Sequence, residues 1–237
     1  MTTAFDLVLF DCDGVLVDSE AISARCVAEA LRQAGYDIDE AGVHARFMGI
    51  SNPTMCAIIE GEMGRPLPAG FLEALRARLI SAAEDELRPV EGVREVVDHL
   101  AIPCCVASSS NPDRVRRYLE LTHLDHRLGR HIFSATMVAQ GKPAPDLFLH
   151  AAKAMGARPD RSVVIEDSIA GVRAGKAAGM TVFGFTGAGH VDGAVHGPRL
   201  LAAGADLVFD AMAALPDLLA RPLPAHGHPP QNPPESR

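Results

Sequence analysis

The chain has 237 residues, enough for one large domain or for a core domain with a smaller second one. Hydrophobic residues make up 48% of it, which supports a packed core. Its formal net charge of −8 disfavours nucleic acid and anionic membranes as partners, because both attract basic surfaces. The five cysteines include no CxxC pair, and the first residues lack the pattern of a signal peptide, so we expect a reduced, cytoplasmic protein.

Short apolar runs alternate with amphipathic helical patterns along most of the chain. The runs expected to form strands are residues 4–10, 102–107, 162–165, 180–185 and 206–209. Apolar residues at helical spacing lie between them, as in residues 93–100 and 148–155. This alternation is typical of an open parallel sheet with helices on both faces. We therefore expect an α/β fold with a Rossmann-like, doubly wound core.

The stretch of residues 20–87 interrupts this alternation, since it carries helical patterns and no convincing strand. We expect it to form an all-helical cap domain, inserted into a core domain made of residues 1–19 and 88–220. Residues 221–237 are rich in proline and cannot build a core, so we expect a disordered tail. We expect His226 and His228 in that tail to be solvated and not to bind metal.

Acidic side chains follow two of the expected strands at their carboxyl ends, where open α/β sheets place their sites. Asp11 and Asp13 follow the first strand, and Glu166 and Asp167 follow the strand at 162–165. Four neighbouring carboxylates repel one another unless a cation lies between them, and oxygen ligands favour Mg²⁺ over zinc. Helix capping or bonding to loop amides would explain one such acid, but not four at two strand ends. We therefore predict that these four residues bind Mg²⁺.

Hydroxyl groups and a lysine complete the predicted site. Asn111 is typical of a helix N-cap and Pro112 of a first helical residue, but capping does not explain the serines that precede them. Hydroxyls and backbone N–H groups at the start of a helix bind anions. Lys142 adds the positive charge that a phosphoryl group in transfer requires. We predict that Ser108, Ser109, Asn111 and Lys142 bind phosphate.

Together these blocks resemble the four motifs of the haloacid dehalogenase superfamily, in its phosphatase and β-phosphoglucomutase-like branch. The blocks are Asp11-Cys12-Asp13-Gly14 within residues 11–19, Ser108, Gly141-Lys142-Pro143, and Glu166-Asp167-Ser168. The resemblance covers about residues 5–219. The helical insertion corresponds to the cap domain of that family.

The resemblance implies hydrolysis of a small-molecule phosphate ester in two steps. Asp11 would form an aspartyl-phosphate, while Asp13 would protonate the leaving oxygen and then activate water. Mg²⁺ would lie on the carboxylates of Asp11 and Asp167 and the main-chain oxygen of Asp13, with Glu166 as a ligand or a support. Ser108, Ser109 and Lys142 would hold the phosphoryl oxygens. We expect a monomer or a weak homodimer.

Three other functions of this fold are alternatives to a phosphatase. A dehalogenase of the family uses one acid and no metal, whereas this chain has Asp13 and the Glu166-Asp167 pair. A phosphoglucomutase of the branch has a cap histidine where Ser23 stands and a cap arginine where residues 48–52 stand, and Asn52 cannot grip a second phosphate as arginine does. A non-catalytic binding module would have lost Asp11 or the metal-binding acids. These comparisons favour a phosphatase, with the mutase as the first alternative and the binding module as the second.

A looser likeness to bacterial 6-phosphogluconate phosphatases concerns the substrate. It rests on stretches such as residues 46–49 and 150–155. We expect a sugar phosphate or sugar-acid phosphate as substrate, with 6-phosphogluconate as a candidate. Cap residues should select it, and the candidates are Glu20, Asn52, Arg76 and Arg78. For the two arginines, a solvated helix face is the alternative explanation.

Overall fold

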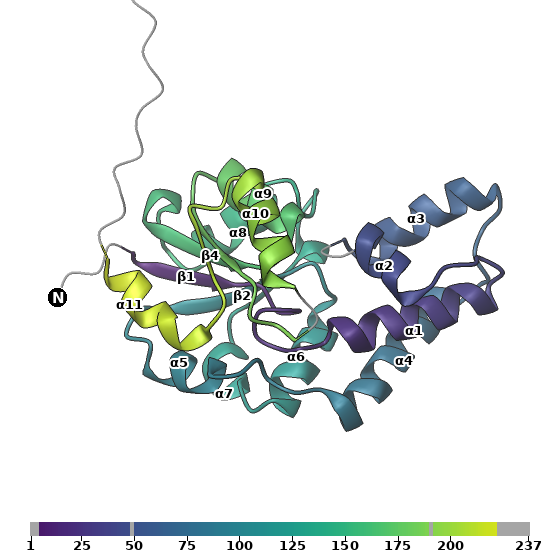
Figure 1. Ribbon diagram of the computed structural model, residues 1–237, viewed down its shortest axis with the longest axis horizontal. Coiled ribbons are helices and arrows are strands. Elements are labelled where there is room, and N and C mark those ends of the chain that lie inside the picture. Colours follow the sequence, from purple (N-terminus) through teal and green to yellow (C-terminus); the bar gives the residue numbers. More distant parts are fainter. Residues whose placement is uncertain (1–4, 48–49, 190–191, 222–237) are drawn as a thin grey trace, which may run out of the picture.

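The computed structural model describes residues 5–47, 50–189 and 192–221 (Figure 1). Its centre is a six-stranded parallel sheet with the strand order β3-β2-β1-β4-β5-β6. The strands are β1 (Leu7–Phe10), β2 (Cys104–Ser108), β3 (Ile132–Ser134), β4 (Ser162–Glu166), β5 (Thr181–Phe185) and β6 (Leu207–Phe209). All five predicted strands are confirmed, and β3 is an additional one. Residue 4 and the predicted disordered tail, from residue 222 onward, lie outside the described residues.

Helices cover both faces of the sheet, as predicted for a doubly wound fold (Figure 1). Side chains alternate along β1, so that Leu7 and Leu9 pack towards α8, α9 and α10, whereas Val8 and Phe10 pack on the opposite side, towards α5, α6 and α11. These helices and their neighbours are α5 (Val93–His99), α6 (Pro112–Leu121), α7 (Asp125–Leu128), α8 (Asp146–Ala154), α9 (Ile169–Ala177), α10 (Gly193–Ala203) and α11 (Leu215–Ala220). Three short 3₁₀ helices are η1 (Ala135–Met137), η2 (Pro159–Arg161) and η3 (Met212–Ala214).

Of the described helices between β1 and β2 in the chain, the four that precede α5 project to one side of the sheet (Figure 1). They are α1 (Glu20–Gln33), α2 (Glu40–Phe47), α3 (Asn52–Met63) and α4 (Phe71–Glu86). Leu31 of α1 and Leu75 and Leu79 of α4 are buried in the apolar interior of this helical cap. The described residues between 20 and 87 contain no strand, so the inserted helical cap is confirmed. The exact domain boundaries, at 19/20 and 87/88, stay a prediction.

Two neighbouring backbone segments connect the cap with the sheet. The N–H of Asp18 donates to the carbonyl oxygen of Arg88, and the N–H of Val90 donates to that of Leu16, both at 3.0 Å. Between them, Val17 and Pro89 form an antiparallel bridge. The chain therefore enters and leaves the cap at a single place, next to the carboxyl end of β1.

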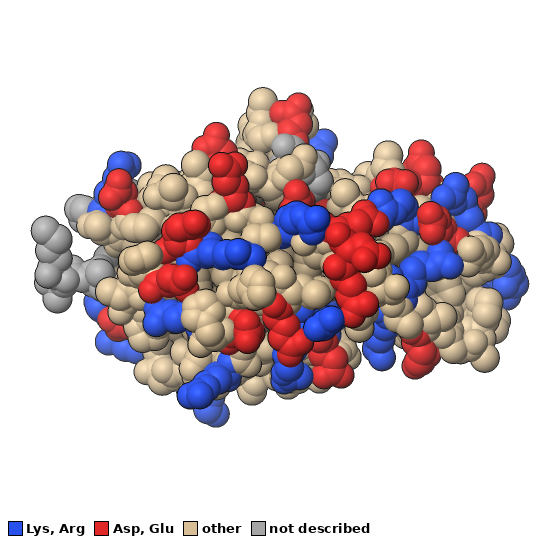
Figure 2. All heavy atoms as spheres, turned by 90° about the horizontal axis from the view of Figure 1, so that it is seen from below, with Lys and Arg blue, Asp and Glu red and all other residues tan. Residues whose placement is uncertain are grey.

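The cysteines are free and buried, as expected for a chain that needs no disulfide. None of the described helices is both long and apolar enough to cross a membrane. On the face seen in Figure 2, positive and negative side chains are interspersed. Ion pairs between different helices, such as Arg117–Glu84 and Arg25–Glu86, are exposed. Exposed pairs of this kind contribute about 0–1 kcal/mol each, so the buried apolar clusters carry the stability.

Candidate active site

A cavity of about 490 Å³ lies between the carboxyl edge of the sheet and the helical cap. Residues predicted from three strand ends and from the loop before α8 meet in its wall. Those on the core side are Asp11, Asp13, Ser108, Ser109, Asn111, Lys142, Glu166 and Asp167. Those on the cap side are Glu20, Asn52 and Arg76. The structure thus brings the predicted core residues together at the place where open α/β sheets bind ligands.

A tight turn after β1 presents the first two acids. The N–H of Asp11 donates to the carbonyl oxygen of Ile165 at 3.0 Å and extends the pairing of β1 with β4. Gly14 has a φ of +81°, a conformation that residues with a side chain rarely adopt, and its N–H donates to the carbonyl oxygen of Val17 at 2.8 Å. The turn directs Asp11 and Asp13 into the cavity while Cys12 between them is buried in the core.

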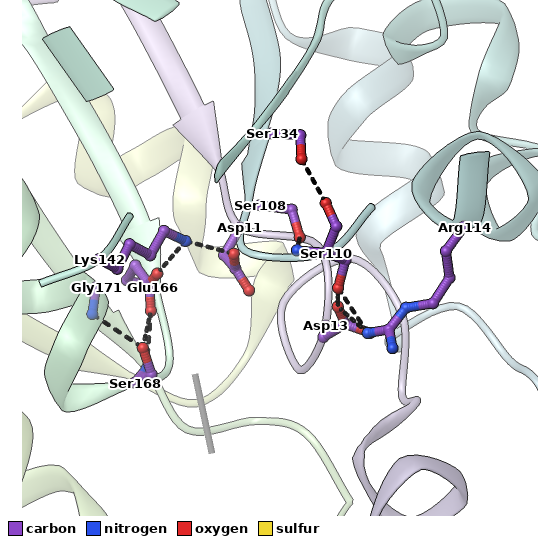
Figure 3. Close-up of polar contacts among 10 residues, drawn as sticks. All are labelled: Asp11, Asp13, Ser108, Ser110, Arg114, Ser134, Lys142, Glu166, Ser168 and Gly171. Atoms are coloured by element: carbon purple, nitrogen blue, oxygen red, sulfur yellow. Dashed lines mark hydrogen bonds and ion pairs between the residues drawn. The ribbon is translucent and has the colours of Figure 1, made fainter. Parts of the chain in front are cut away.

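Lys142 joins the first acid to the fourth motif. Its Nζ donates to Oδ1 of Asp11 at 2.5 Å and to Oε1 of Glu166 at 2.6 Å (Figure 3). The lysine side chain is 1% exposed and lies 5.0 Å from the centre of the Phe148 ring. Burial opposes the charge, but Asp11 and Glu166 outweigh it and raise the pKa of Lys142. The ammonium therefore stays charged beside Asp11.

Asp13 points away from Lys142, towards α6 (Figure 3). Its Oδ1 accepts a hydrogen bond from Ser19 at 2.5 Å, and its Oδ2 accepts from Ser110 at 2.6 Å and from Nη2 of Arg114 at 2.7 Å. Burial favours the neutral acid, but Arg114 and the hydrogen bonds from the two serines together lower the pKa of Asp13. The two aspartates of the turn thus face different cations, Lys142 for Asp11 and Arg114 for Asp13.

Sequence analysis assigned no role to Ser110 or Arg114. A signal for the arginine was nevertheless present. Arg114 lies in the first turn of α6, directly after Pro112 and Asp113, where the partial positive charge of a helix N-terminus disfavours a cation. An arginine at such a position needs an acidic partner from elsewhere in the chain, and here that partner is Asp13.

Ser168 and Gly171 hold Glu166 in place. The backbone N–H and the hydroxyl of Ser168 donate to Oε2 of Glu166 at 2.8 and 2.9 Å, and the N–H of Gly171 donates to the Ser168 hydroxyl at 3.0 Å. A Cβ atom added at Gly171 would lie 1.7 Å from Oε1 of Glu166. The carboxylate therefore fills the space that any other residue at position 171 would need.

Replacing Gly171 with alanine is expected to displace the Glu166 side chain and to weaken its ion pair with Lys142. We expect a loss of about 1–3 kcal/mol in the free energy of unfolding, as for other overpacked sites, together with a clear loss of catalytic turnover. Chemical denaturation measures the first effect, and an activity assay measures the second. Gly61→Ala is the matched control, because nothing lies within 4 Å of its added Cβ in α3, so it should stabilise the fold slightly. Equal stability of the two variants would contradict the predicted clash.

The four predicted metal-binding acids line the same cavity but do not converge on one point, and their binding of Mg²⁺ stays a prediction. In the described part of the chain, no three Asp, Glu, His or Cys side chains gather into a metal-binding group. The physical reason is that Glu166 is turned to Lys142 and Ser168, and Asp13 to Arg114. Both acids are therefore already engaged by cations or donors of the protein.

The remaining donors nevertheless fit a hard divalent cation. If all four acids were ionised, the two cations Lys142 and Arg114 would leave two negative charges in a buried site. Burial, followed by repulsion from Glu166, raises the pKa of Asp167 well above its usual range. Burial also raises the pKa of Asp11 to about 7. A divalent cation would offset the excess charge, and oxygen donors suit Mg²⁺.

The start of α6 forms the part of the wall predicted to hold phosphate. Oδ1 of Asn111 accepts from the N–H of Asp113 at 2.9 Å, and Pro112 is the first helical residue, so the predicted N-cap is confirmed. The hydroxyl of Ser108, at the end of β2, accepts from the N–H of Ser110 at 3.0 Å. Because the side-chain oxygen of Asn111 accepts the capping hydrogen bond, its amide nitrogen is the group available to donate to a ligand.

On the cap side, the wall is formed by small polar residues, apolar side chains and one arginine. The polar and charged residues are Glu20, Ser23, His44, Ser51, Asn52, Thr54 and Arg76. Asn52 opens α3 directly after its N-cap, Ser51, whose hydroxyl accepts from the N–H of Thr54 at 3.3 Å. Met48 and Gly49, from the cap loop compared with mutases, lie outside the described residues.

Arg78, predicted with Arg76 as a specificity residue, lies elsewhere. Its Nη1 forms an ion pair with Glu29 at 3.1 Å, and its Nη2 donates to Gln33 at 3.1 Å. It lines a separate shallow hollow between α1 and α4. Residues two positions apart on a helix point to nearly opposite sides. Arg76 therefore faces the cavity, whereas Arg78 faces α1. Arg78 thus matches the alternative expectation of a solvated surface residue.

The fold and the site together define an α/β enzyme with a buried acidic centre beneath a helical cap. Residues 5–179 match the model of the haloacid dehalogenase-like hydrolases. The chain belongs to this family.

Individual relatives agree with that assignment. The chain is 31% identical to the 6-phosphogluconate phosphatase of Escherichia coli K12 over 214 residues, which cover 90% of this chain and 94% of the relative. It is 27% identical to a β-phosphoglucomutase of Mycobacterium tuberculosis over an alignment that covers 87% of this chain and 90% of the relative.

Solved structures show the same architecture. A haloacid dehalogenase-like protein of unknown function from Agrobacterium tumefaciens is 40% identical, with a TM-score of 0.76 over 91% of this chain and 98% of the other. A hydrolase of the family from Deinococcus radiodurans, solved with bound phosphate and sodium, is 35% identical, with a TM-score of 0.70 over 92% and 96% of the two chains.

Proposed function

We propose that this chain is a Mg²⁺-dependent phosphatase that hydrolyses a small phosphorylated sugar or sugar acid through an aspartyl-phosphate on Asp11. Its membership of the family, with named phosphatases among its relatives, makes it a phosphoric monoester hydrolase. One observation carries the finer proposal, namely the buried contact of Asp11 with the charged Lys142 on the core side of the cavity. A nucleophilic carboxylate beside a fixed ammonium is what attack on an anionic phosphoryl group requires.

In the first step, a carboxylate oxygen of Asp11 forms a bond to phosphorus while the bond from phosphorus to the ester oxygen breaks. Asp13 acts in this step in its protonated form, which the second step regenerates, and gives its proton to that oxygen, so the product leaves as an alcohol. Lys142 offsets charge on the phosphoryl oxygens, and the hydroxyls of Ser108 and Ser109 at the end of β2 donate to them.

In the second step, Asp13 takes a proton from a water molecule whose oxygen attacks phosphorus. The bond between phosphorus and Asp11 breaks, inorganic phosphate leaves, and the Asp11 carboxylate is restored. The carboxylates of Asp11 and Asp167 and the main-chain oxygen of Asp13 would hold Mg²⁺. When bound, the ion supplies positive charge that neutralises the phosphoryl group.

Several features support a hydroxylated, anionic substrate. A cavity of about 490 Å³ suits a small metabolite, and its cap side carries hydroxyl and amide groups for hydrogen bonds to a sugar. Arg76 offers a positive charge to a carboxylate at the far end of the substrate. The relative from Escherichia coli is named for 6-phosphogluconate, a sugar-acid phosphate, which makes this compound the first candidate.

A mutase activity and a non-catalytic role are the alternatives. Ser23 and Asn52 line the cavity where a histidine and an arginine would support mutase chemistry, and the mutase relative is less similar than the phosphatase. A binding module without chemistry would have no need for the buried contact between Asp11 and Lys142. Neither alternative is favoured by a particular contact.

A panel of sugar, sugar-acid and polyol phosphates, assayed for released phosphate with Mg²⁺, tests the proposal. We expect sugar-acid phosphates, with 6-phosphogluconate among them, to be the best substrates. β-Glucose-1-phosphate is assayed in parallel for glucose-6-phosphate, and its formation would favour the mutase. If no ester in the panel releases phosphate, the non-catalytic binding module is the alternative that remains.

Removal of Mg²⁺ by a chelator is expected to abolish turnover, and added Mg²⁺ should restore it. Thermal unfolding provides a readout independent of activity, because an ion that binds the folded chain stabilises it by about 2.7 kcal/mol at a hundred times its Kd. The Asp167→Asn variant should lose most of this Mg²⁺-dependent stabilisation. Full turnover in the chelator, or equal stabilisation of both proteins, would argue against the assigned metal site.

A further inference from the structure

Arg114 is a buried cation in the cavity wall that belongs to none of the four motifs. It extends from the first turn of α6, and its side chain is 12% exposed. Nη2 donates to Oδ2 of Asp13 at 2.7 Å and to the hydroxyl of Ser110 at 2.6 Å (Figure 3). The guanidinium lies 5.3 Å from the centre of the Tyr118 ring, which supports it from the next turn of the helix.

The three side chains form a closed triangle, because the Ser110 hydroxyl also donates to Oδ2 of Asp13 at 2.6 Å. The backbone of Ser110 is fixed as well. Its N–H donates to Ser108 at 3.0 Å, and its carbonyl oxygen accepts from Ser134 of β3 at 2.7 Å. The carboxylate of Asp13 is therefore held by groups anchored in α6, β2 and β3.

Stability alone does not explain this arrangement. Nε of Arg114 is buried without a hydrogen-bond partner in the described structure. The cation also lies at the helix end that disfavours positive charge. A buried ion pair such as Arg114–Asp13 is a weak source of stability, because taking both charges out of water offsets their attraction. A costly pair that faces the reaction cavity is better explained by what it does to Asp13.

We propose that Arg114 is a positioning residue that, together with Ser110, fixes the carboxylate of Asp13 for proton transfer. This inference rests on the proposed phosphatase function. The two cations serve different acids. Lys142 lies beside Asp11, the attacking acid, and Arg114 lies beside Asp13, the acid that gives and takes the proton. Without Arg114, the Asp13 side chain can rotate away from the leaving oxygen and from the attacking water. A misplacement of about 1 Å slows proton transfer by orders of magnitude.

Kinetics of Arg114→Gln with two kinds of ester test this role. On an alkyl phosphate, whose leaving oxygen needs a proton, we expect kcat to fall about 10- to 100-fold while KM changes less than about twofold. This loss is smaller than the contribution of about 10²- to 10⁴-fold that is typical of the acid–base group itself. p-Nitrophenyl phosphate releases an anion that needs no proton. The variant should therefore release one p-nitrophenolate per enzyme in a rapid burst, followed by slow turnover, since hydrolysis of the aspartyl-phosphate still depends on Asp13.

Four further variants protect the test against general damage to the fold. Arg116→Gln is the matched control, because Arg116 lies two residues along α6 in an exposed pair with Asp113, and it should be fully active. Arg114→Lys keeps a positive charge and should retain more activity than the glutamine variant. Arg114→Ala should recover several-fold when guanidinium ion is added at millimolar concentration. Ser110→Ala removes the second donor and should show the same leaving-group dependence if the Arg114 variants do not fold.

The proposal is overturned if Arg114→Gln keeps its kcat, or if KM rises while kcat is unchanged, which would make Arg114 a substrate-binding group. It is also overturned if the burst with the aryl ester slows as much as turnover of the alkyl ester. A wild-type enzyme that hydrolyses no ester would instead overturn the proposed function together with this role. The wild-type control thus distinguishes the two failures.

Discussion

Replacing Asp11 with asparagine is expected to lower kcat by a factor of about 10⁴ or more, the order of loss seen when a catalytic nucleophile is removed. The carboxamide cannot form the aspartyl-phosphate, yet its oxygen can still accept the hydrogen bond that Lys142 gives to Asp11. Burial already opposes the charge of Asp11, so a neutral group of the same shape should fold as well as the wild type. Phosphate release and thermal unfolding measure the two effects.

A matched control for this variant lies at the other end of the same strand. Asp6 precedes β1 and forms an exposed ion pair with Arg161, and Asp6→Asn should remain fully active. Asp11→Asn with more than a few per cent of wild-type turnover would refute the role of nucleophile. Loss of folding in Asp11→Asn would instead indicate that its contact with Lys142 is structural.

Replacing Asp13 with asparagine is expected to lower turnover of alkyl phosphates by about 10²- to 10⁴-fold, the usual contribution of a general acid and base. Asparagine is preferred to alanine here, because its oxygen still accepts from Arg114, whose charge would otherwise lose its partner in the cavity wall. The effect should exceed that of any Arg114 variant, since the group that moves the proton is itself removed.

Leaving-group dependence distinguishes proton transfer from a mere loss of charge at position 13. With p-nitrophenyl phosphate, the Asp13→Asn variant should transfer the phosphoryl group to Asp11 and then stall, so a phosphorylated protein should accumulate. Mass spectrometry detects it as an added phosphate. Equal slowing of the aryl and alkyl esters, with no phosphorylated protein, would show that Asp13 does not act as the acid and base.

Much of the sheet could be predicted from the sequence because its buried strands are short apolar runs that end in polar motifs. The runs before Asp11, Ser108 and Glu166 are of this kind, and each became a strand whose end lies in the cavity wall. Strand β3 escaped prediction because only three residues pair with β2, and two of them, Ile132 and Phe133, are half-exposed. So short a run carries little periodicity.

The parts of the site that the sequence did not reveal depend on contacts between distant elements. Arg114 and Asp13 are 101 residues apart in the sequence. No sequence pattern near either residue indicates that the first turn of α6 lies next to the end of β1. The choice between Arg76 and Arg78 needs the rotation of α4 about its axis, which follows from packing against α1. The orientation of Glu166 depends on Lys142 and on the missing side chain at Gly171.

The junction between cap and sheet has a consequence for how new activities can arise on this scaffold. Because the segments around Val17 and Pro89 run side by side, the cap helices form a module attached at one point. Such a module can be lengthened, shortened or exchanged without altering the order or register of the six strands. The cap side of the cavity can therefore change through one contiguous stretch of sequence, while the acids and cations on its core side keep their places.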